Sequence, residues 1–144
     1  MIYKTLIIED EHRLREALSI MLEMVATDTI QIIGYAESVE EATKMIDRLK
    51  PDLVFMDIML KNGTGFEVLQ QISFNAFHLI FTTAYEQHAI NAFKYSAVDY
   101  LLKPVDPQEL KTAIERIAIL QERVLEKQQI TELQTNLSKT PDRI

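Results

Sequence analysis

Five short apolar runs are spaced along the chain, and they are nearly continuous rather than alternating with polar residues. They are Leu6–Ile8, Ile30–Ile33, Leu53–Met56, Leu79–Phe81 and Tyr100–Leu102. Strands that are buried on both faces of a parallel sheet carry such runs, whereas a strand with one wet face alternates. The pattern therefore predicts five strands of one buried, parallel sheet.

Amphipathic helical patterns lie between and after these runs. Apolar residues recur at offsets of three and four over residues 14–25, 39–49, 68–72 and 110–117, and more weakly over 89–93. Ser38 with Glu41, and Thr64 with Glu67, have the spacing of capping boxes and predict two of the helix starts. Alternation of strand and helix predicts an α/β, doubly wound sheet with the flavodoxin-like strand order 2-1-3-4-5.

The last helix has a well-marked start and an unclear end. Asp106 at the N-cap and Pro107 at the first helical position mark where it begins. From Gln121 to Leu137 the sequence still favours helix, but its apolar residues drift out of phase with the preceding turns. Residues 138–143 have the composition of a linker. We therefore expect a domain over residues 1–120, followed by a helical extension and linker over 121–144.

Length, charge and cysteine content narrow the class of protein. The 144 residues suffice for one domain, and the absence of cysteine excludes disulfides and thiolate metal sites. The net charge of −7 is a poor match for the phosphate backbone of nucleic acid, so DNA contact would need another part of the protein. The apolar run near the N-terminus is too short for a signal peptide or a membrane span, and we expect a cytoplasmic protein.

Chemically useful side chains follow the predicted strands at the points where they end. Glu9 and Asp10 follow the first, Asp57 the third, Thr83 the fourth and Lys103 the fifth. The carboxyl ends of parallel strands share one edge of a sheet, which is where ligands bind in this architecture. Carboxylates gathered there repel one another unless a cation joins them, and all-oxygen ligands favour Mg²⁺. An aspartate beside a metal, an ammonium and a hydroxyl can attack phosphorus.

Each of these residues also has an ordinary structural explanation. Asp10 could be an acid at a helix N-terminus, Asp57 a turn residue and Lys103 a surface lysine. His12 and His78, like His88, have no metal-ligand spacing and are interpreted as structural. The combination of suitable residue types at four strand ends is what favours a phosphoryl-transfer site.

Several motifs together resemble the receiver domain of bacterial response regulators, over roughly residues 2–120. They are Ile8-Glu9-Asp10-Glu11, Pro51-Asp52-Leu53-Val54-Phe55-Met56-Asp57-Ile58, Gly65, Thr82-Thr83-Ala84 and Asp99-Tyr100-Leu101-Leu102-Lys103-Pro104. The resemblance implies a phosphorylation-dependent signalling switch rather than a conventional enzyme. It also implies a sensor histidine kinase as the phosphate donor and Mg²⁺ as the cofactor.

The resemblance assigns roles to individual residues. Asp57 would accept the phosphoryl group, while Glu9, Asp10 and the backbone carbonyl of Met59 would join it around Mg²⁺. The ammonium group of Lys103 would contact the phosphoryl group. A second set would act as a switch, in which the hydroxyl of Thr83 reorients toward phosphate and the ring of Tyr100 turns inward. The Lys103–Pro104 peptide bond is expected to be cis.

Two positions depart from the usual pattern of the family. Lys61 stands where a proline is usual, which predicts a looser loop and adds a cation near the site. Met59 occupies a position bordering the path of attacking water, and its apolar side chain cannot orient that water, so we expect a moderately long-lived phosphorylated state.

The sequence from Phe81 to Pro104 is similar to regulators with a LytTR-type DNA-binding output domain. We expect no such domain within residues 1–144, so DNA would be contacted only through an output domain that is missing here. A homodimer through the fourth helix, fifth strand and fifth helix is a further expectation. The extended helix could also form a coiled coil, although its phase break and Gln128-Gln129 argue against a strict heptad.

Rival interpretations remain at this stage. A haloacid-dehalogenase-type phosphatase would need an acid where Met59 stands. A flavodoxin-like cofactor-binding protein would need a loop that accepts phosphate where Glu9, Asp10 and Glu11 stand. A stand-alone receiver, or a receiver-like interaction module that is never phosphorylated, fits the same residues.

Overall fold

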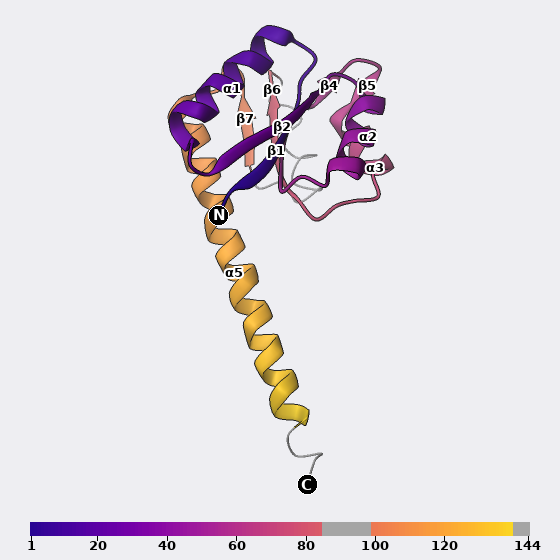
Figure 1. The fold of residues 1–144 in the computed structure, drawn as a ribbon. Helices are drawn as coiled ribbons and strands as arrows, with labels where there is room; N and C mark the ends of the chain where they lie inside the picture. The colour runs from indigo at the N-terminus through magenta and orange to yellow at the C-terminus, as the bar shows by residue number, and fades with distance from the viewer. Residues whose placement is uncertain (85–98, 140–144) are drawn as a thin grey trace.

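A five-stranded parallel sheet forms the centre of the molecule in the computed structural model, which describes residues 1–84 and 99–139. Its strands are β1 (Tyr3–Ile8), β2 (Ile30–Ala36), β3 (Leu53–Asp57), β6 (His78–Thr83) and β7 (Asp99–Leu102). The spatial order is β2-β1-β3-β6-β7, with every neighbouring pair parallel (Figure 1). Because β6 and β7 are the fourth and fifth strands of this sheet, the predicted α/β fold and strand order are confirmed.

Helices cover both faces of the sheet. They are α1 (His12–Ala26), α2 (Val39–Leu49), α3 (Gly65–Gln71) and α5 (Pro107–Lys139). The α1 and α5 helices pack together on one face, and α2 and α3 on the other (Figure 1). Buried apolar side chains form one core cluster under each pair of helices. The weak helical pattern over residues 89–93 lies outside the described residues.

The predicted helix starts are borne out by side-chain hydrogen bonds. Ser38 Oγ accepts a hydrogen bond from the backbone N–H of Glu41 at 3.2 Å, and Thr64 Oγ1 accepts one from Glu67 at 3.3 Å. Each bond satisfies an amide that has no partner within its own helix. The two helices that begin beside the edge of the sheet are therefore capped by residues visible in the sequence.

A small hairpin between β3 and α3 was not predicted from the sequence. It pairs β4 (Met59–Leu60) with β5 (Gly63–Thr64) in antiparallel register. Asn62 has φ +65°, a conformation that asparagine and glycine tolerate better than other residues. The Asn62-Gly63 pair is a strong hairpin signal, but strands of two residues are too short to give a hydrophobic pattern. This hairpin sets the course of the chain immediately after Asp57.

The α5 helix is longer than the sequence analysis predicted. It is a single helix of 33 residues that continues well past the sheet (Figure 1). Ser138 and Lys139, which were expected to belong to a linker, are its last residues. Serine and lysine lack the strong helix-breaking tendency of glycine or proline, so that prediction was wrong for these two positions. The remaining linker residues lie outside the described part of the chain.

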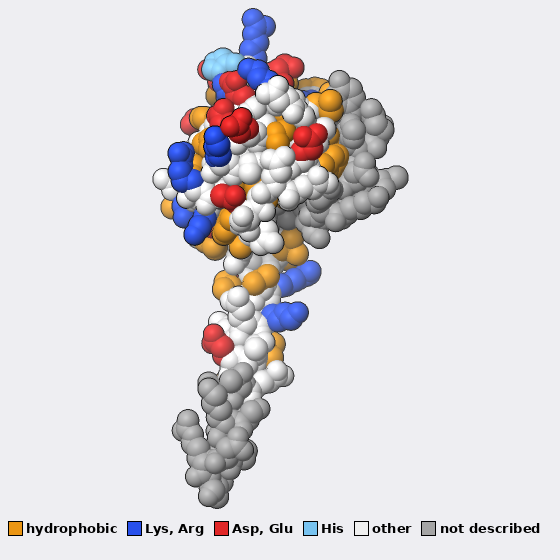
Figure 2. Space-filling model, turned by 90° about the vertical axis from the view of Figure 1, so that its right-hand side faces the viewer, with side chains coloured by type: hydrophobic (Ala, Val, Ile, Leu, Met, Phe, Trp, Pro, Cys, Tyr) orange, Lys and Arg blue, Asp and Glu red, His pale blue; other side chains and the backbone are white. Residues whose placement is uncertain are grey.

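The projecting part of α5 carries a mixed surface. Apolar side chains lie beside lysine and arginine side chains along it (Figure 2). Val124, Leu125, Ile130 and Leu133 are all exposed. Among the helices of residues 1–84 and 99–139, none has the combination of length and apolar character that spanning a membrane requires.

Candidate functional site

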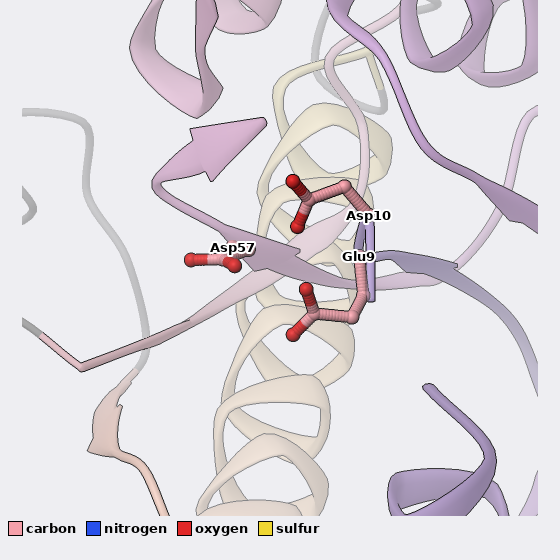
Figure 3. Close-up of side chains that lie close together, drawn as sticks. All are labelled: Glu9, Asp10 and Asp57. Carbon is pink, nitrogen blue, oxygen red and sulfur yellow. The ribbon is translucent and has the colours of Figure 1, made fainter. Parts of the chain in front are cut away.

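The carboxyl edge of the sheet brings three acidic side chains together. Glu9 and Asp10 directly follow β1, and Asp57 is the last residue of the neighbouring strand β3. Each offers one carboxylate oxygen to a group whose atoms all lie within 4.8 Å of one another. Figure 3 shows the three side chains side by side at this edge. Glu9 and Asp57 are buried, while Asp10 is half-buried.

Lys103 reaches this cluster from the end of β7. Its ammonium group donates a hydrogen bond to Asp57 Oδ2 at 2.8 Å and a second, very short one to Glu9 Oε1. The side chain is only 14% exposed, so it forms ion pairs in a poorly solvated place. The backbone N–H of Lys103 donates to the carbonyl of Thr83, and the Lys103–Pro104 bond is cis, as predicted. The lysine is thus held by the sheet as well as by the two acids.

The charges of the cluster are incompletely balanced. Burial is the largest influence on Glu9 and, with the nearby charge of Asp57, raises its pKa to about 7, although Lys103 acts in the opposite direction. Burial alone would lower the pKa of Lys103, but its hydrogen bonds to Asp57 and Glu9 outweigh that effect and raise it. One ammonium group neutralises only part of the negative charge of three carboxylates, so a further cation would stabilise the cluster.

The backbone around Asp57 is closely fitted. Its Oδ1 accepts a hydrogen bond from the N–H of Met59 at 3.3 Å, so both carboxylate oxygens have a donor. Gly65, the first residue of α3, packs against the same strand end. A Cβ atom at Gly65 would lie 2.8 Å from the carbonyl oxygen of Asp57, which is too close for any other residue without a backbone shift. The glycine thus lets α3 begin directly against Asp57.

Thr83 and Tyr100 lie on the two strands beyond Asp57. Thr83 ends β6 and is fully buried, and its register partner on β7 is Leu102. Tyr100 pairs with Phe81 in the same ladder and is half-buried against the core cluster on the α2–α3 side. Thr83 therefore lies at the same edge as the acids, as the sequence analysis predicted for strand ends, whereas Tyr100 lies two residues before the end of β7.

A network of charged side chains beside the acids was not found by sequence reasoning. Glu37, which follows β2, pairs with Arg15 of α1 at 3.0 Å and with Lys61 of the hairpin at 2.9 Å. Hydrogen bonds from Lys61, and then from Arg15, lower the pKa of Glu37. These residues are 22 and 24 positions apart from Glu37, and no spacing rule links residues so distant in sequence.

Lys61 ties the loop after Asp57 to neighbouring segments of the chain. Its backbone N–H donates to the carbonyl of Glu37 at 3.2 Å, and its own carbonyl accepts from the N–H of Val39 at 3.4 Å. Together with the Lys61–Glu37 ion pair, these bonds join the hairpin to the start of α2. The expectation of a looser loop, made because a proline is missing, did not allow for these links.

The donor set suits a hard divalent cation. Three carboxylate oxygens within 4.8 Å of one another, two of them buried and one with a raised pKa, form a site whose charge a cation would relieve. Oxygen ligands together with space for water are typical of Mg²⁺ sites in proteins. Glu9, Asp10 and Asp57 therefore fit Mg²⁺. Met59 lies next to Asp57, where its backbone carbonyl is the remaining predicted ligand.

Residues 5–115 match the response regulator receiver domain. The chain belongs to the response-regulator receiver family. Receiver domains act as signalling switches rather than conventional enzymes, they bind Mg²⁺ at an acidic pocket, and membership implies a sensor kinase as partner. The phosphatase and flavodoxin-like alternatives are thereby excluded.

Relatives of this receiver domain include regulators of which the match covers slightly less than half. It is 42% identical to a response regulatory protein of Vibrio vulnificus over 114 residues, covering 78% of this chain and 46% of that protein. It is 38% identical to the sensory transduction protein LytT of Bacillus anthracis over 116 residues, again covering 78% and 46%. The transcriptional regulatory protein BtsR of Salmonella typhi is 35% identical, with 79% and 47% covered. The chain spans about half the length of these relatives.

Solved structures show the same receiver fold. The response regulatory domain of mrkE from Klebsiella pneumoniae superposes with a TM-score of 0.74 at 28% identity, covering 83% of this chain and 98% of that domain. The receiver domain of AraT from Geobacillus stearothermophilus gives a TM-score of 0.69 at 28% identity, covering 89% and 99%.

Proposed function

We propose that Asp57 accepts a phosphoryl group from a phosphohistidine of a sensor histidine kinase. The observation that carries the proposal is the bridge from Lys103 to Asp57 and Glu9 within the carboxylate cluster. A buried aspartate held beside an ammonium and a metal-binding group has the partners that phosphoryl transfer requires.

The proposed reaction is an in-line displacement at phosphorus. A carboxylate oxygen of Asp57 attacks the phosphorus atom, the P–N bond breaks, and its electron pair leaves with the imidazole nitrogen. The product is an aspartyl phosphate. A bound Mg²⁺ would supply neutralisation of charge on the phosphoryl oxygens, held by Glu9, Asp10, Asp57 and the carbonyl of Met59. The ammonium of Lys103 exchanges its bond to Asp57 for one to the phosphoryl group.

The proposed response to phosphate involves the next two strands. The buried hydroxyl of Thr83 donates a hydrogen bond to the new phosphoryl oxygens, and the ring of Tyr100 moves inward to fill the space behind it. Tyr100 and Leu102 both lie on β7, and the chain runs from the end of β7 into α5. The movement of the Tyr100 ring therefore changes the surface formed by β7 and α5. That surface is the proposed contact for a partner or a second copy of the chain.

The proposed output is transcriptional. Relatives named as transcriptional and sensory transduction regulators are about twice as long as the region that matches this chain, which supports a second, LytTR-type DNA-binding region in the complete protein. The receiver domain would cover residues 1–120, and residues 121–144 would form the helical connection to that region. A two-component regulator of this kind would act in the cytoplasm.

Acetyl phosphate labelling tests the acceptor. With MgCl₂ present, the wild-type chain should gain the mass of one phosphoryl group, and Asp57→Asn should gain none. Asp28→Asn, a change of the same chemistry at an exposed residue, should label like the wild type. Labelling of Asp57→Asn at the wild-type level would refute the assignment. Failure of the folded wild type to label at all would favour an interaction module that works without phosphorylation.

A further inference from the structure

The guanidinium group of Arg15 makes several polar contacts beside the carboxylate cluster, and none of the roles described above accounts for them. One guanidinium nitrogen, Nη1, donates to the backbone carbonyl of Glu9 at 3.2 Å and to Glu37 Oε1 at 3.0 Å. The other, Nη2, lies 3.0 Å from His12 Nδ1. The side chain is only 15% exposed, although most arginines extend into water.

The arginine is itself held in place by neighbouring elements. Its guanidinium lies over the ring of Tyr35 on β2, 5.6 Å from the ring centroid. The hydroxyl of that tyrosine is 3.1 Å from Ser19 Oγ on α1. A cation over an aromatic ring and a planar fork of donors both limit how the side chain can turn. The side chain of Arg15 is therefore held in a fixed conformation that connects α1 to the end of β2.

These contacts link the two backbone segments that carry the proposed metal ligands. On one side Arg15 binds the carbonyl of Glu9, the residue before Asp10. On the other side it binds Glu37, which pairs with Lys61 in the hairpin that contains Met59. The N–H of Glu9 donates to the carbonyl of Ala36 at 2.9 Å, so Arg15 binds the carbonyl of a residue whose N–H is already tied to β2.

We propose that Arg15 is a positioning residue of the Mg²⁺ site. It fixes the backbone of Glu9 and Asp10 relative to the hairpin after Asp57 without touching the metal. This inference rests on the proposed function, because it assumes that the three carboxylates bind Mg²⁺. Groups that orient metal ligands from outside commonly change metal affinity by about 10–100-fold when they are removed.

A simple charge argument gives the opposite prediction. Arg15 is a cation close to a cation-binding site, so deleting its charge should strengthen Mg²⁺ binding if electrostatics alone mattered. Positioning predicts weaker binding after the same deletion. The sign of the change therefore separates the two explanations.

The experiment is a calorimetric titration of the full chain with MgCl₂ at constant ionic strength. Arg15→Met removes the charge and the donors, whereas Arg15→Lys keeps the charge and loses the planar fork. Arg13→Met removes a cation from an exposed position on the same helix and is the matched control. Urea unfolding of each variant in EDTA shows whether the metal-free fold is intact, and amide NMR shifts of Glu9, Asp10 and Met59 report on the two segments directly.

We expect both Arg15→Met and Arg15→Lys to weaken Mg²⁺ binding by about 10-fold or more. Arg13→Met should bind as the wild type does or slightly more tightly. Binding by Arg15→Met that is unchanged or tighter than wild type would overturn the inference while leaving the metal site itself in place. If Arg15→Met does not fold, Arg15→Lys decides the question by the same criterion. Absence of Mg²⁺ binding to the wild type would overturn the proposed function, and this inference with it.

Discussion

Three carboxylates and one ammonium share the carboxyl edge of the sheet, and their arrangement depends on a few individual contacts. Lys103 occupies one oxygen each of Asp57 and Glu9, while the N–H of Met59 holds the second oxygen of Asp57. The raised pKa of Glu9 reflects burial that one lysine does not offset. At the residue scale, the site is thus arranged around Asp57, with negative charge in excess.

The side chain of Met59 should affect how long phosphate stays on Asp57. It is 45% exposed and stands two residues after Asp57, where we expect it to border the approach of water. We expect Met59→Asn to shorten the half-life of the phosphorylated state several-fold, because an amide can orient water and a thioether cannot. Decay of the label after removal of acetyl phosphate measures this. Met24→Asn makes the same change at an exposed methionine of α1 and should leave the half-life as it is. Equal half-lives for wild type and Met59→Asn would contradict the prediction.

Individual site residues differed in how well the sequence revealed them. Sequence reasoning found Asp57, Asp10 and Lys103 because a strand end has a fixed place in a parallel sheet, and the apolar runs located those ends. It did not find Arg15 and Glu37, because their pairing depends on the packing of α1 beside β2. Side-chain contacts between elements follow from packing in three dimensions, which no periodic pattern encodes.

At the element scale, β1, β3, β6 and β7 determine which residues meet, and α5 extends away from the sheet. Continuous apolar runs predicted the strands, and capping residues predicted the helix starts, because both are local consequences of burial and hydrogen bonding. The hairpin of β4 and β5 was missed because its strands are too short for a pattern. The end of α5 was misplaced because exposed turns of a helix carry no apolar stripe to mark where they stop.

Truncation of α5 should separate its structural part from its extension. Ending the chain after Lys127 removes residues 128–134, which are all exposed, along with the rest of the chain, so we expect the free energy of unfolding to change by less than about 0.5 kcal/mol. Ending it after Arg116 also removes the buried side chain of Ile117 and should cost roughly 2–5 kcal/mol. Urea unfolding measures both. Clear destabilisation by the shorter deletion would show that the extension belongs to the folded domain, contrary to the proposed boundary near residue 120.

At the scale of the whole molecule, the chain is a compact receiver domain with an acidic site at one edge and a long helix that continues beyond the other. The net charge of −7 and the three clustered carboxylates both favour a bound cation. The contact between His78 Nε2 and Gln121 Oε1, 3.1 Å apart, joins the start of β6 to the middle of α5. The sheet and the proximal half of the helix are therefore one packed unit.

Mg²⁺ should stabilise this unit against unfolding. The cation relieves repulsion that is present only when the strands are assembled, so it binds the folded chain in preference to the unfolded one. At free Mg²⁺ ten times the dissociation constant, the gain is about 1.4 kcal/mol. Urea unfolding in MgCl₂, compared with EDTA and KCl at equal ionic strength, measures it. Asp10→Asn should lose most of the gain, and an equal gain in that variant would place the cation elsewhere.

Because α5 is continuous, a tilt at its first turn would move its far end. The helix begins three residues after Pro104, close to the lysine of the site, and runs unbroken to Lys139. At 1.5 Å per residue its 33 residues span about 50 Å. A tilt of about 10° at the first turn would displace the far end of such an arm by about 9 Å. If phosphorylation of Asp57 tilted the helix by that amount, its far end would move by a distance comparable to the diameter of a helix.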